Sequence, residues 1–293
     1  MRLSYSKIKM FKECRKKYFY NYIEKIEPKR KSLALMMGES LQNAIEALYS
    51  DFNSKRSTYV DKGGNVNYEL MSEALGCIQG QITSYFIDKG IDDPTIIHTV
   101  GSMFQGYVKK YYNEDLKDIK EYLPEYECQK ELMPGVSLIV KVDGLVKKAN
   151  DSWWIFENKS TSGDPRKVKT ELSYNDQGKT YIYGIDREVK GVVFNIIKKP
   201  SIRINKKESV SDFLKRLIDE YILTPEKYIL REETYYSAEQ MKEFEKDTYQ
   251  VANDIVNCCA YYRSPSEGCA YCPYEPLCSG YGDYSNYNVK KKV

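Results

Sequence analysis

Two carboxylates and a lysine, Asp143, Glu157 and Lys159, are the residues best placed in the sequence to do chemistry. Asp143 lies late in a run of β-forming residues, and Glu157 and Lys159 lie at the end of the next such run. Residues two apart in a strand point to the same face, so Glu157 and Lys159 share one side of a sheet. Two carboxylates supply the hard oxygen ligands that Mg²⁺ or Mn²⁺ prefers, and a lysine beside them can orient a water or offset charge on a phosphate.

A predicted β-hairpin carries these three residues. Residues 138–147 form an apolar strand, Asn150 and Asp151 supply the turn, and the strand resumes over 153–156. The alternative is that charged residues at strand ends are ordinary solvated edges or turn contacts, and short motifs often match by chance. The choice between these two interpretations depends on the rest of the chain.

The composition limits the classes of protein to which the 293-residue chain can belong. Its hydrophobic share of 42% allows a core, and 30% of its residues are charged. The net charge of +3 is too weakly positive for a uniformly basic nucleic-acid binder. Any contact with DNA must therefore come from local basic patches. The single histidine, His98, has no catalytic spacing around it, which excludes a triad hydrolase and sites built on several imidazoles.

The sequence also predicts the compartment. No run approaches the roughly 18 apolar residues that a membrane span needs, and the charged N-terminal segment lacks the apolar centre of a signal peptide. We therefore expect an intracellular, cytoplasmic protein without membrane contact. Its eight cysteines would then be reduced thiols or metal ligands rather than disulfides.

Three cysteines near the C-terminus have the spacing of a metal–thiolate site. Cys269, Cys272 and Cys278 form a C-x2-C-x5-C motif among turn residues. A tetrahedral site needs a fourth ligand, and Cys14 in the N-terminal helix is the candidate, although a buried apolar thiol is the usual state of a free cysteine. Zinc and a [4Fe–4S] cluster both suit four thiolates, and the spacing does not decide between them. The other cysteines are expected to be buried apolar thiols: Cys77, Cys128, Cys258 and Cys259.

The remaining pattern predicts a helical first part and a mixed second part. The expected helices cover residues 4–23, 32–52, 68–90, 94–113, 173–188, 210–222 and 237–262. The helix over 210–222 is amphipathic, and the helix over 237–262 begins with a Ser237–Gln240 capping box. Further strands are expected at 125–133, 191–198 and 227–236, a polar loop at 53–67, a basic loop at 161–171, and a mobile tail beyond Gly280.

Together, the motifs resemble the RecB-type branch of the PD-(D/E)XK nuclease superfamily, especially its iron–sulfur members such as the CRISPR-associated and AddB-type exonucleases. The opening segment with Cys14 is similar to that family's first helix. GESLQNAIEALY resembles its motif I helix, which normally reads Gly-x-x-x-His-x-x-x-Glu. VDG at 142–144, ENK at 157–159 and QGKTY at 177–181 match its metal-binding strands and its Gln-x-x-x-Tyr helix, and the C-terminal cysteines match its cluster loop.

The resemblance implies roles for individual residues. Asp143 and Glu157 would bind Mg²⁺ or Mn²⁺, with the backbone carbonyl of Asn158 as a further ligand, and Lys159 would be the catalytic lysine. Gln177 and Tyr181, one helical turn apart, would point together into the site and position DNA or the catalytic groups.

One position departs from the family pattern. The motif I histidine is replaced by Gln42, whose amide oxygen can bind Mg²⁺ or Mn²⁺ but is a weaker donor than imidazole toward softer metals. The expected metal ligands therefore include Gln42, assisted by Glu39 or Glu46.

The resemblance implies an α/β fold: a PD-(D/E)XK restriction-endonuclease-like mixed central sheet with flanking helices, a helical insertion and a C-terminal Cys cluster loop. The expected parts are N-terminal helices over 1–52, the insertion over 53–123, the nuclease core over 124–236, and the last helix, cluster loop and tail over 237–293.

The expected function is metal-dependent hydrolysis of DNA, as an exonuclease, in repair, recombination or the processing of CRISPR or phage DNA. Arg166, Lys167 and Lys169 would grip the DNA, which would be single-stranded or a duplex end. Further partners would be another copy of the chain or recombination or CRISPR proteins. Two alternatives stay open: a DNA-binding or recombination scaffold with a weakened site, which Gln42 favours, and a zinc-stabilised structural protein.

Overall fold

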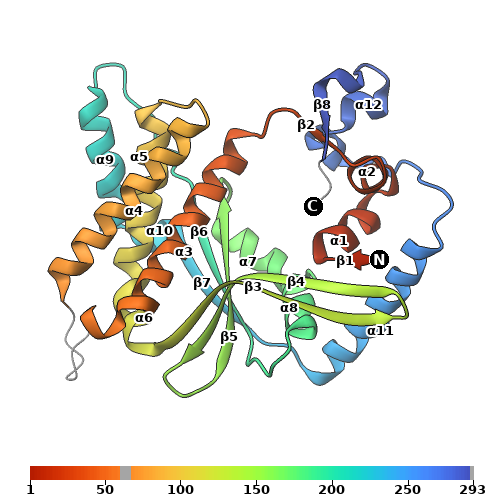
Figure 1. Ribbon diagram of the computed structural model, residues 1–293. Coiled ribbons are helices and arrows are strands. Elements are labelled where there is room, and N and C mark those ends of the chain that lie inside the picture. Colours follow the sequence, from red (N-terminus) through yellow and green to blue (C-terminus); the bar gives the residue numbers. More distant parts are fainter. Residues whose placement is uncertain (60–66, 291–293) are drawn as a thin grey trace.

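The computed structural model describes residues 1–59 and 67–290 and shows a mixed six-stranded sheet with helices on both faces (Figure 1). The strands are β1 (Arg2–Leu3), β3 (Ile119–Met133), β4 (Val136–Lys148), β5 (Trp153–Thr161), β6 (Val192–Lys198) and β7 (Ile229–Thr234). Their order is β1-β4-β5-β6-β7, with β3 also paired to β4. Parallel and antiparallel pairs both occur, so the expected α/β architecture with a mixed central sheet is confirmed.

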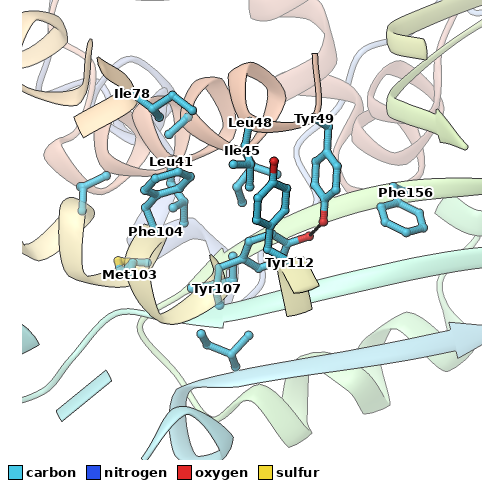
Figure 2. Packing of buried hydrophobic residues seen from close by; sticks show 14 of the residues in the cluster. Leu41, Ile45, Leu48, Tyr49, Ile78, Met103, Phe104, Tyr107, Tyr112 and Phe156 are labelled. Atoms are coloured by element: carbon cyan, nitrogen blue, oxygen red, sulfur yellow. Dashed lines mark hydrogen bonds between the residues drawn. The ribbon is translucent and has the colours of Figure 1, made fainter. Parts of the chain in front are cut away.

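A layer of helices covers one face of the sheet. It consists of α3 (Leu33–Tyr59), α4 (Tyr68–Asp88), α5 (Pro94–Tyr107), a π-helical turn (Val108–Tyr112), α6 (Asn113–Asp118) and α9 (Val210–Leu223). Their buried side chains, such as Leu41, Ile45 and Phe104, pack with the sheet residue Phe156 in one apolar cluster (Figure 2). Within the described residues, no helix is both long and apolar enough to cross a membrane.

The opposite face of the sheet carries shorter helices. These are α1 (Tyr5–Glu13), α7 (Pro165–Tyr174) and α8 (Gln177–Gly184), with α11 (Ala238–Val256) packed against α1 and α8. Leu172 of α7 and Tyr181 and Ile185 at α8 bury against Val140 and Phe194 of the sheet. A short helix, α10 (Pro225–Tyr228), leads into β7. The sheet is therefore buried on both faces, and polar groups within it need partners.

The two ends of the chain meet in a small assembly of their own (Figure 1). It contains α2 (Arg15–Tyr18), a π-helical turn (Phe19–Ile23), β2 (Ile26–Pro28), α12 (Glu275–Ser279) and β8 (Tyr287–Val289). β2 and β8 pair antiparallel, and Tyr20, Ile26 and Tyr274 form a buried cluster beneath them. The expectation of a mobile tail beyond Gly280 is therefore wrong as far as residue 290; residues 291–293 lie outside the described part.

The N-terminal helix expected over 4–23 is interrupted. Ser4 caps α1 by accepting a hydrogen bond from the Lys7 N–H. Cys14 then adopts an extended backbone (φ −161°, ψ 111°), and the helix restarts at Arg15. The sequence pattern did not show this break, because apolar spacing continues across it.

The next helix is longer than expected. α3 runs to Tyr59 with a kink at Lys55, whose φ is −119°. The loop expected over 53–67 is thus wrong as far as residue 59. Residues 60–66 of that loop, with Gly63 and Gly64, lie outside the described residues.

The basic loop expected over 161–171 is wrong, because α7 begins at Pro165. The Asp164 carboxylate accepts a hydrogen bond from the Arg166 N–H, and proline occupies the first turn, which is a common way to start a helix. The helix expected over 173–188 is reduced to α8, which begins at Gln177 where the Asn175 side chain accepts the Gln177 N–H at 3.0 Å.

The last long helix is shorter than expected. Its Ser237–Gln240 capping box is confirmed, but α11 ends at Val256, so Cys258 and Cys259 follow the helix. Among the cysteines expected to be buried, Cys128 is buried, whereas Cys77 and Cys259 are exposed and contradict the expectation.

The paired chain ends predict a stabilising role for Tyr287. Its ring stacks on Tyr274 with centroids 5.9 Å apart, and its hydroxyl donates to the Pro273 carbonyl at 2.7 Å. Tyr287→Ala is expected to lower the free energy of unfolding by about 1–2 kcal/mol in urea titrations. Tyr281→Ala is the matched control, because that side chain is 92% exposed. Equal effects of the two substitutions would contradict the packing of the tail.

Candidate active site

The site forms where two neighbouring strands separate. β4 and β5 pair only between Gly144–Phe156 and Lys147–Trp153, whereas the pairing of β5 with β6, in parallel, continues from Ile155 to Thr161. Asp143 and Glu157 are the first residues beyond the last paired position. The Asn158 N–H donates to Asp143 Oδ2 at 2.7 Å, which links the two strands across the opening.

One oxygen of Glu157 gathers three of the side chains singled out in the sequence. Glu157 Oε1 accepts hydrogen bonds from Lys159 Nζ at 2.7 Å, Gln177 Nε2 at 2.9 Å and the Tyr181 hydroxyl at 3.1 Å. Gln177 and Tyr181 lie one turn apart on α8 and also contact each other at 2.7 Å. The structure therefore brings the Glu-x-Lys strand and the Gln-x-x-x-Tyr helix together around a single carboxylate.

The position of α8 depends on a glycine. At Gly178 a Cβ atom would lie 2.3 Å from the Tyr236 hydroxyl, a distance that no side chain can occupy without displacing the tyrosine. Glycine at this position lets the first turn of α8 approach closely. Gln177, the residue before it, is thereby held within hydrogen-bond distance of Glu157.

Glu157 is buried and Asp143 lies half-buried beside it, without enough positive charge to balance two carboxylates. Burial, followed by the charge of Glu157, raises the pKa of Asp143 from 3.8 to about 8, against the opposing effects of the Asn158 N–H and Lys159. Glu157 is 4% exposed, and its Oε2 has no hydrogen-bond partner among the described residues. A divalent cation at this position would supply both the missing charge and the missing partner.

The donor set therefore fits Mg²⁺ or Mn²⁺, with a small protein contribution. Among the described residues, no three His, Cys, Asp or Glu side chains converge to hold one ion. Asp143 and Glu157, with the carbonyl of Asn158, leave positions for water and substrate, which is how Mg²⁺ usually binds in enzymes.

A groove of about 600 Å³ opens onto these groups. Asp143, Asn158 and Lys159 line it from the sheet, and Gly38 and Gln42 line it from α3. A Cβ atom at Gly38 would lie 2.7 Å from Ser160 Oγ, so glycine lets α3 approach the sheet here. The groove gives an extended substrate access to the carboxylates.

Other residues considered in the sequence lie at or beyond the rim. Glu39 lines the groove but is engaged by Lys31 at 3.1 Å and by the Tyr85 hydroxyl at 2.9 Å. Glu46 lies outside the lining residues, and burial and the charge of Glu125 raise its pKa. His98 lies on α5, likewise outside the lining.

The basic residues of the expected DNA-binding loop lie on α7. Arg166 and Lys167 are exposed, and Lys169 forms an ion pair with Glu232 at 2.8 Å. All three lie outside the residues that line the groove. The structure thus places them on the helix that follows the active strand rather than beside the carboxylates.

Two polar residues that the sequence reasoning missed lie directly behind the site. Asn195 of β6 is fully buried and pairs in register with Asn158 on one side and with Arg231 of β7 on the other. The available signal was the single asparagine within the apolar run GVVFNIIK. No sequence pattern pointed to Arg231, because its position beside Asn195 follows only from the pairing of β6 with β7.

The four cysteines of the expected metal centre share one cavity. Cys14, Cys269, Cys272 and Cys278 line a space of about 190 Å³, although Cys14 lies at the opposite end of the sequence. Burial raises the pKa of the Cys272 thiol, Lys17 opposes that rise, and the neighbouring Cys14 and Cys269 add to it. The backbone N–H of Ser266 donates to Cys269 Sγ at 3.4 Å.

A comparison with protein-family models identifies the superfamily of this chain. The family model of the PD-(D/E)XK nuclease superfamily matches residues 2–279, and the chain belongs to that superfamily. Among solved structures it is similar to one titled "Crystal structure of SSO0001", with 13% identity over 85% of this chain and 96% of that one. The TM-score of 0.36 is too low to support any argument from that likeness. A search of curated proteins finds no match.

The burial of Asp143 predicts how Asp143→Asn changes stability with pH. Wild-type protein keeps a proton on Asp143 up to about pH 8, whereas the unfolded chain releases it near 3.8. Its stability therefore falls as the pH rises through this window and levels off above it, and asparagine has no such dependence. In EDTA, the gain in Tm from Asp143→Asn should be larger at about pH 9 than at about pH 5.

Added Mn²⁺ provides the control for that measurement. It should raise the Tm of the wild-type protein and leave that of Asp143→Asn nearly unchanged. A gain that is the same at both pH values in EDTA would contradict the burial of an uncompensated carboxylate.

Proposed function

We propose that this protein is a Mg²⁺- or Mn²⁺-dependent deoxyribonuclease. Membership of the PD-(D/E)XK superfamily implies a nuclease. The observation that carries the more specific proposal is the Asp143–Glu157 pair, with an unpartnered oxygen on the buried Glu157 and Lys159 in contact with it, beside an open groove that Asp143 and Lys159 line. This constellation suits hydrolysis of a phosphodiester.

In this proposal the residues of the site have separate roles. Asp143, Glu157 and the Asn158 carbonyl would hold the cation, which when bound supplies a Lewis acid for attack by water. Lys159 lies 2.7 Å from Glu157 and borders the groove, so its ammonium group can offset charge that develops on the phosphate. Gln177 and Tyr181 bind Glu157 Oε1, which leaves its second oxygen available to a cation.

The direction of cleavage and the pathway rest on the sequence resemblance. Similarity to CRISPR-associated and AddB-type exonucleases extends the proposal to degradation of DNA from an end, in repair, recombination or the processing of CRISPR or phage DNA. Arg166 and Lys167 of α7, exposed just after the active strand, are proposed to bind the DNA backbone. Lys169 would join them by exchanging its partner Glu232 for a phosphate.

The rival function is that of a DNA-binding scaffold with a weakened site, which the replacement of the family histidine by Gln42 favours. The geometry argues against it. A site without a cation would gain stability by losing a buried carboxylate, yet both are present and are held by Lys159, Gln177 and Tyr181.

We also propose that the four cysteines hold a metal centre, with a [4Fe–4S] cluster favoured over zinc. Their shared cavity supports a centre, and the ligand chemistry suits either metal. Among the described residues, no three His, Cys, Asp or Glu side chains converge to hold one ion. The preference for a [4Fe–4S] cluster rests on the sequence resemblance to the iron–sulfur members of the superfamily.

Cleavage assays on Lys159→Ala test the proposed nuclease. Metal-dependent loss of labelled linear DNA should fall by at least about 100-fold, because a charge aimed at the transition state is removed. Binding of the same DNA should stay within about twofold of wild type, because Lys159 is one of several cationic contacts.

The matched control is the double variant Arg166→Ala/Lys167→Ala. It should weaken DNA binding and reduce its salt dependence by about two phosphate contacts, while cleavage at saturating DNA persists. Cleavage by Lys159→Ala at a wild-type rate would overturn the assigned active site.

Metal analysis of protein purified without air tests the cysteine centre. Wild-type protein should contain about four iron and four sulfide per chain and should be brown. Cys14→Ser and Cys272→Ser should each lose the iron, whereas Cys77→Ser, at an exposed cysteine outside the cavity, should keep it. Stoichiometric zinc in a colourless protein would select the alternative metal. Absence of both iron and zinc would overturn the proposal.

A further inference from the structure

A chain of four hydrogen-bonded side chains runs from the buried interior to the active groove. Arg231 Nε donates to Asn195 Oδ1 at 2.7 Å, Asn195 Nδ2 donates to Asn158 Oδ1 at 2.9 Å, and Asn158 Nδ2 donates to Gln42 Oε1 at 2.9 Å. The three strand residues lie side by side because β5, β6 and β7 pair in that register. We call this chain the amide relay.

The direction of every bond in the amide relay is dictated by Arg231. A guanidinium group can donate but cannot accept, so the Asn195 atom that faces it has to be the oxygen. The amide nitrogen of Asn195 then faces Asn158, which must present its own oxygen, and so on to Gln42. Rotating any one of the three amides by 180° would place two donors or two acceptors against each other.

The arginine that starts the amide relay is itself fixed. Its guanidinium forms a bidentate ion pair with Asp115 at 2.6 and 2.8 Å and contacts the Tyr107 hydroxyl at 3.1 Å. Asp115 is 5% exposed and also accepts the Tyr49 hydroxyl. Arg231 stacks on Tyr111 with its guanidinium carbon 4.0 Å from the ring centroid. Such a buried, multiply bonded group has no alternative orientation at low cost.

At the other end, Gln42 is left with its nitrogen free. Its Oε1 is used by Asn158, and its Nε2 is buried with no hydrogen-bond partner among the described residues. Gln42 borders the same groove as Asp143 and Lys159. A buried donor without a partner is unusual, and an acceptor from outside the chain would satisfy it.

We propose that Gln42 serves the active site as a hydrogen-bond donor to a phosphate oxygen of the substrate, and that it is not a metal ligand. The inference rests on the proposed function, since the cation concerned is the one held by Asp143 and Glu157. It departs from the expectation that the Gln42 oxygen takes the place of the family's histidine. Arg231, Asn195 and Asn158 are positioning residues, which set the orientation of Gln42 without touching the substrate.

Asn195→Asp tests the amide relay, because it should reverse the polarity of the remaining links. A carboxylate at position 195 still accepts from Arg231 but cannot donate to Asn158. Asn158 would then turn its nitrogen toward position 195 and its oxygen toward Gln42, and Gln42 would turn its oxygen toward the cation. Calorimetric titration with Mn²⁺ should show about tenfold tighter binding than in wild type, because the Gln42 oxygen would add a ligand.

A double-mutant cycle separates this effect from the added negative charge. Gln42→Ala alone should leave the Mn²⁺ affinity within about twofold of wild type while lowering kcat about tenfold or more, since it removes a donor and no metal ligand. Asn195→Asp should then have no effect on Mn²⁺ affinity in the Gln42→Ala background. Equal tightening in both backgrounds would show a charge effect and would overturn the relay.

Two further outcomes make the test complete. Weakening of Mn²⁺ binding by Gln42→Ala, by about threefold or more, would show that its oxygen binds the metal and would overturn the proposal even if Asn195→Asp does not fold. Asp143→Ala reports on the proposed function itself, because it should weaken Mn²⁺ binding at least about tenfold. If it does not, the metal site is wrong; if it does and Gln42→Ala also weakens binding, only the donor role of Gln42 is wrong.

Discussion

The constraint on which the rest of the structure depends is the placement of two carboxyl groups beside each other, with Glu157 buried and Asp143 half-buried. Burial and mutual repulsion raise the pKa of Asp143 to about 8, so the pair is unfavourable without a cation. The fold accepts this cost by separating β4 from β5 at this position and closing the opening with one bond, from the Asn158 N–H to Asp143. Lys159, Gln177 and Tyr181 then fix one oxygen of Glu157 and leave the other free.

The two faces of the sheet contribute different parts of the site. Because side chains alternate along β5, Glu157 and Lys159 point toward α8, whereas Asn158 between them points toward α3. One face thus fixes the carboxylate, and the other fixes Gln42 through Asn195 and Arg231. The helical layer therefore does more than cover the sheet. Its residues Tyr107 and Asp115 fix Arg231, which sets the orientation of Gln42 in the groove.

Local sequence patterns predicted most of the residues around the Glu157 carboxylate. The residues around Gln42 could not be predicted, because their positions depend on long-range strand pairing. The i, i+2 spacing of Glu157 and Lys159 and the i, i+4 spacing of Gln177 and Tyr181 are visible in the sequence, and the structure brings these four side chains together. The amide relay joins positions 158, 195 and 231, which only the pairing of β5, β6 and β7 makes neighbours, to position 42 on α3. The sequence offered a single hint of it, the asparagine in an apolar strand.

The wrong boundaries have similar causes. The segment over 161–171, which contains most of α7, looked like a loop because it is basic, although Asp164 and Pro165 begin a helix. The C-terminal tail looked mobile because it is polar, yet Tyr287 packs against Tyr274 and β8 pairs with β2, contacts that join opposite ends of the chain. Composition predicts the average behaviour of such segments, whereas a few specific long-range contacts decide the actual one.

The most direct test of the central claim is anomalous diffraction from crystals soaked in Mn²⁺. The account predicts a peak between the unpartnered Glu157 Oε2 and the Asp143 carboxylate, within about 2.5 Å of both, at the point where β4 and β5 separate. A fully occupied peak elsewhere, with none beside these two carboxylates, would contradict the claim that the buried pair is a cation site.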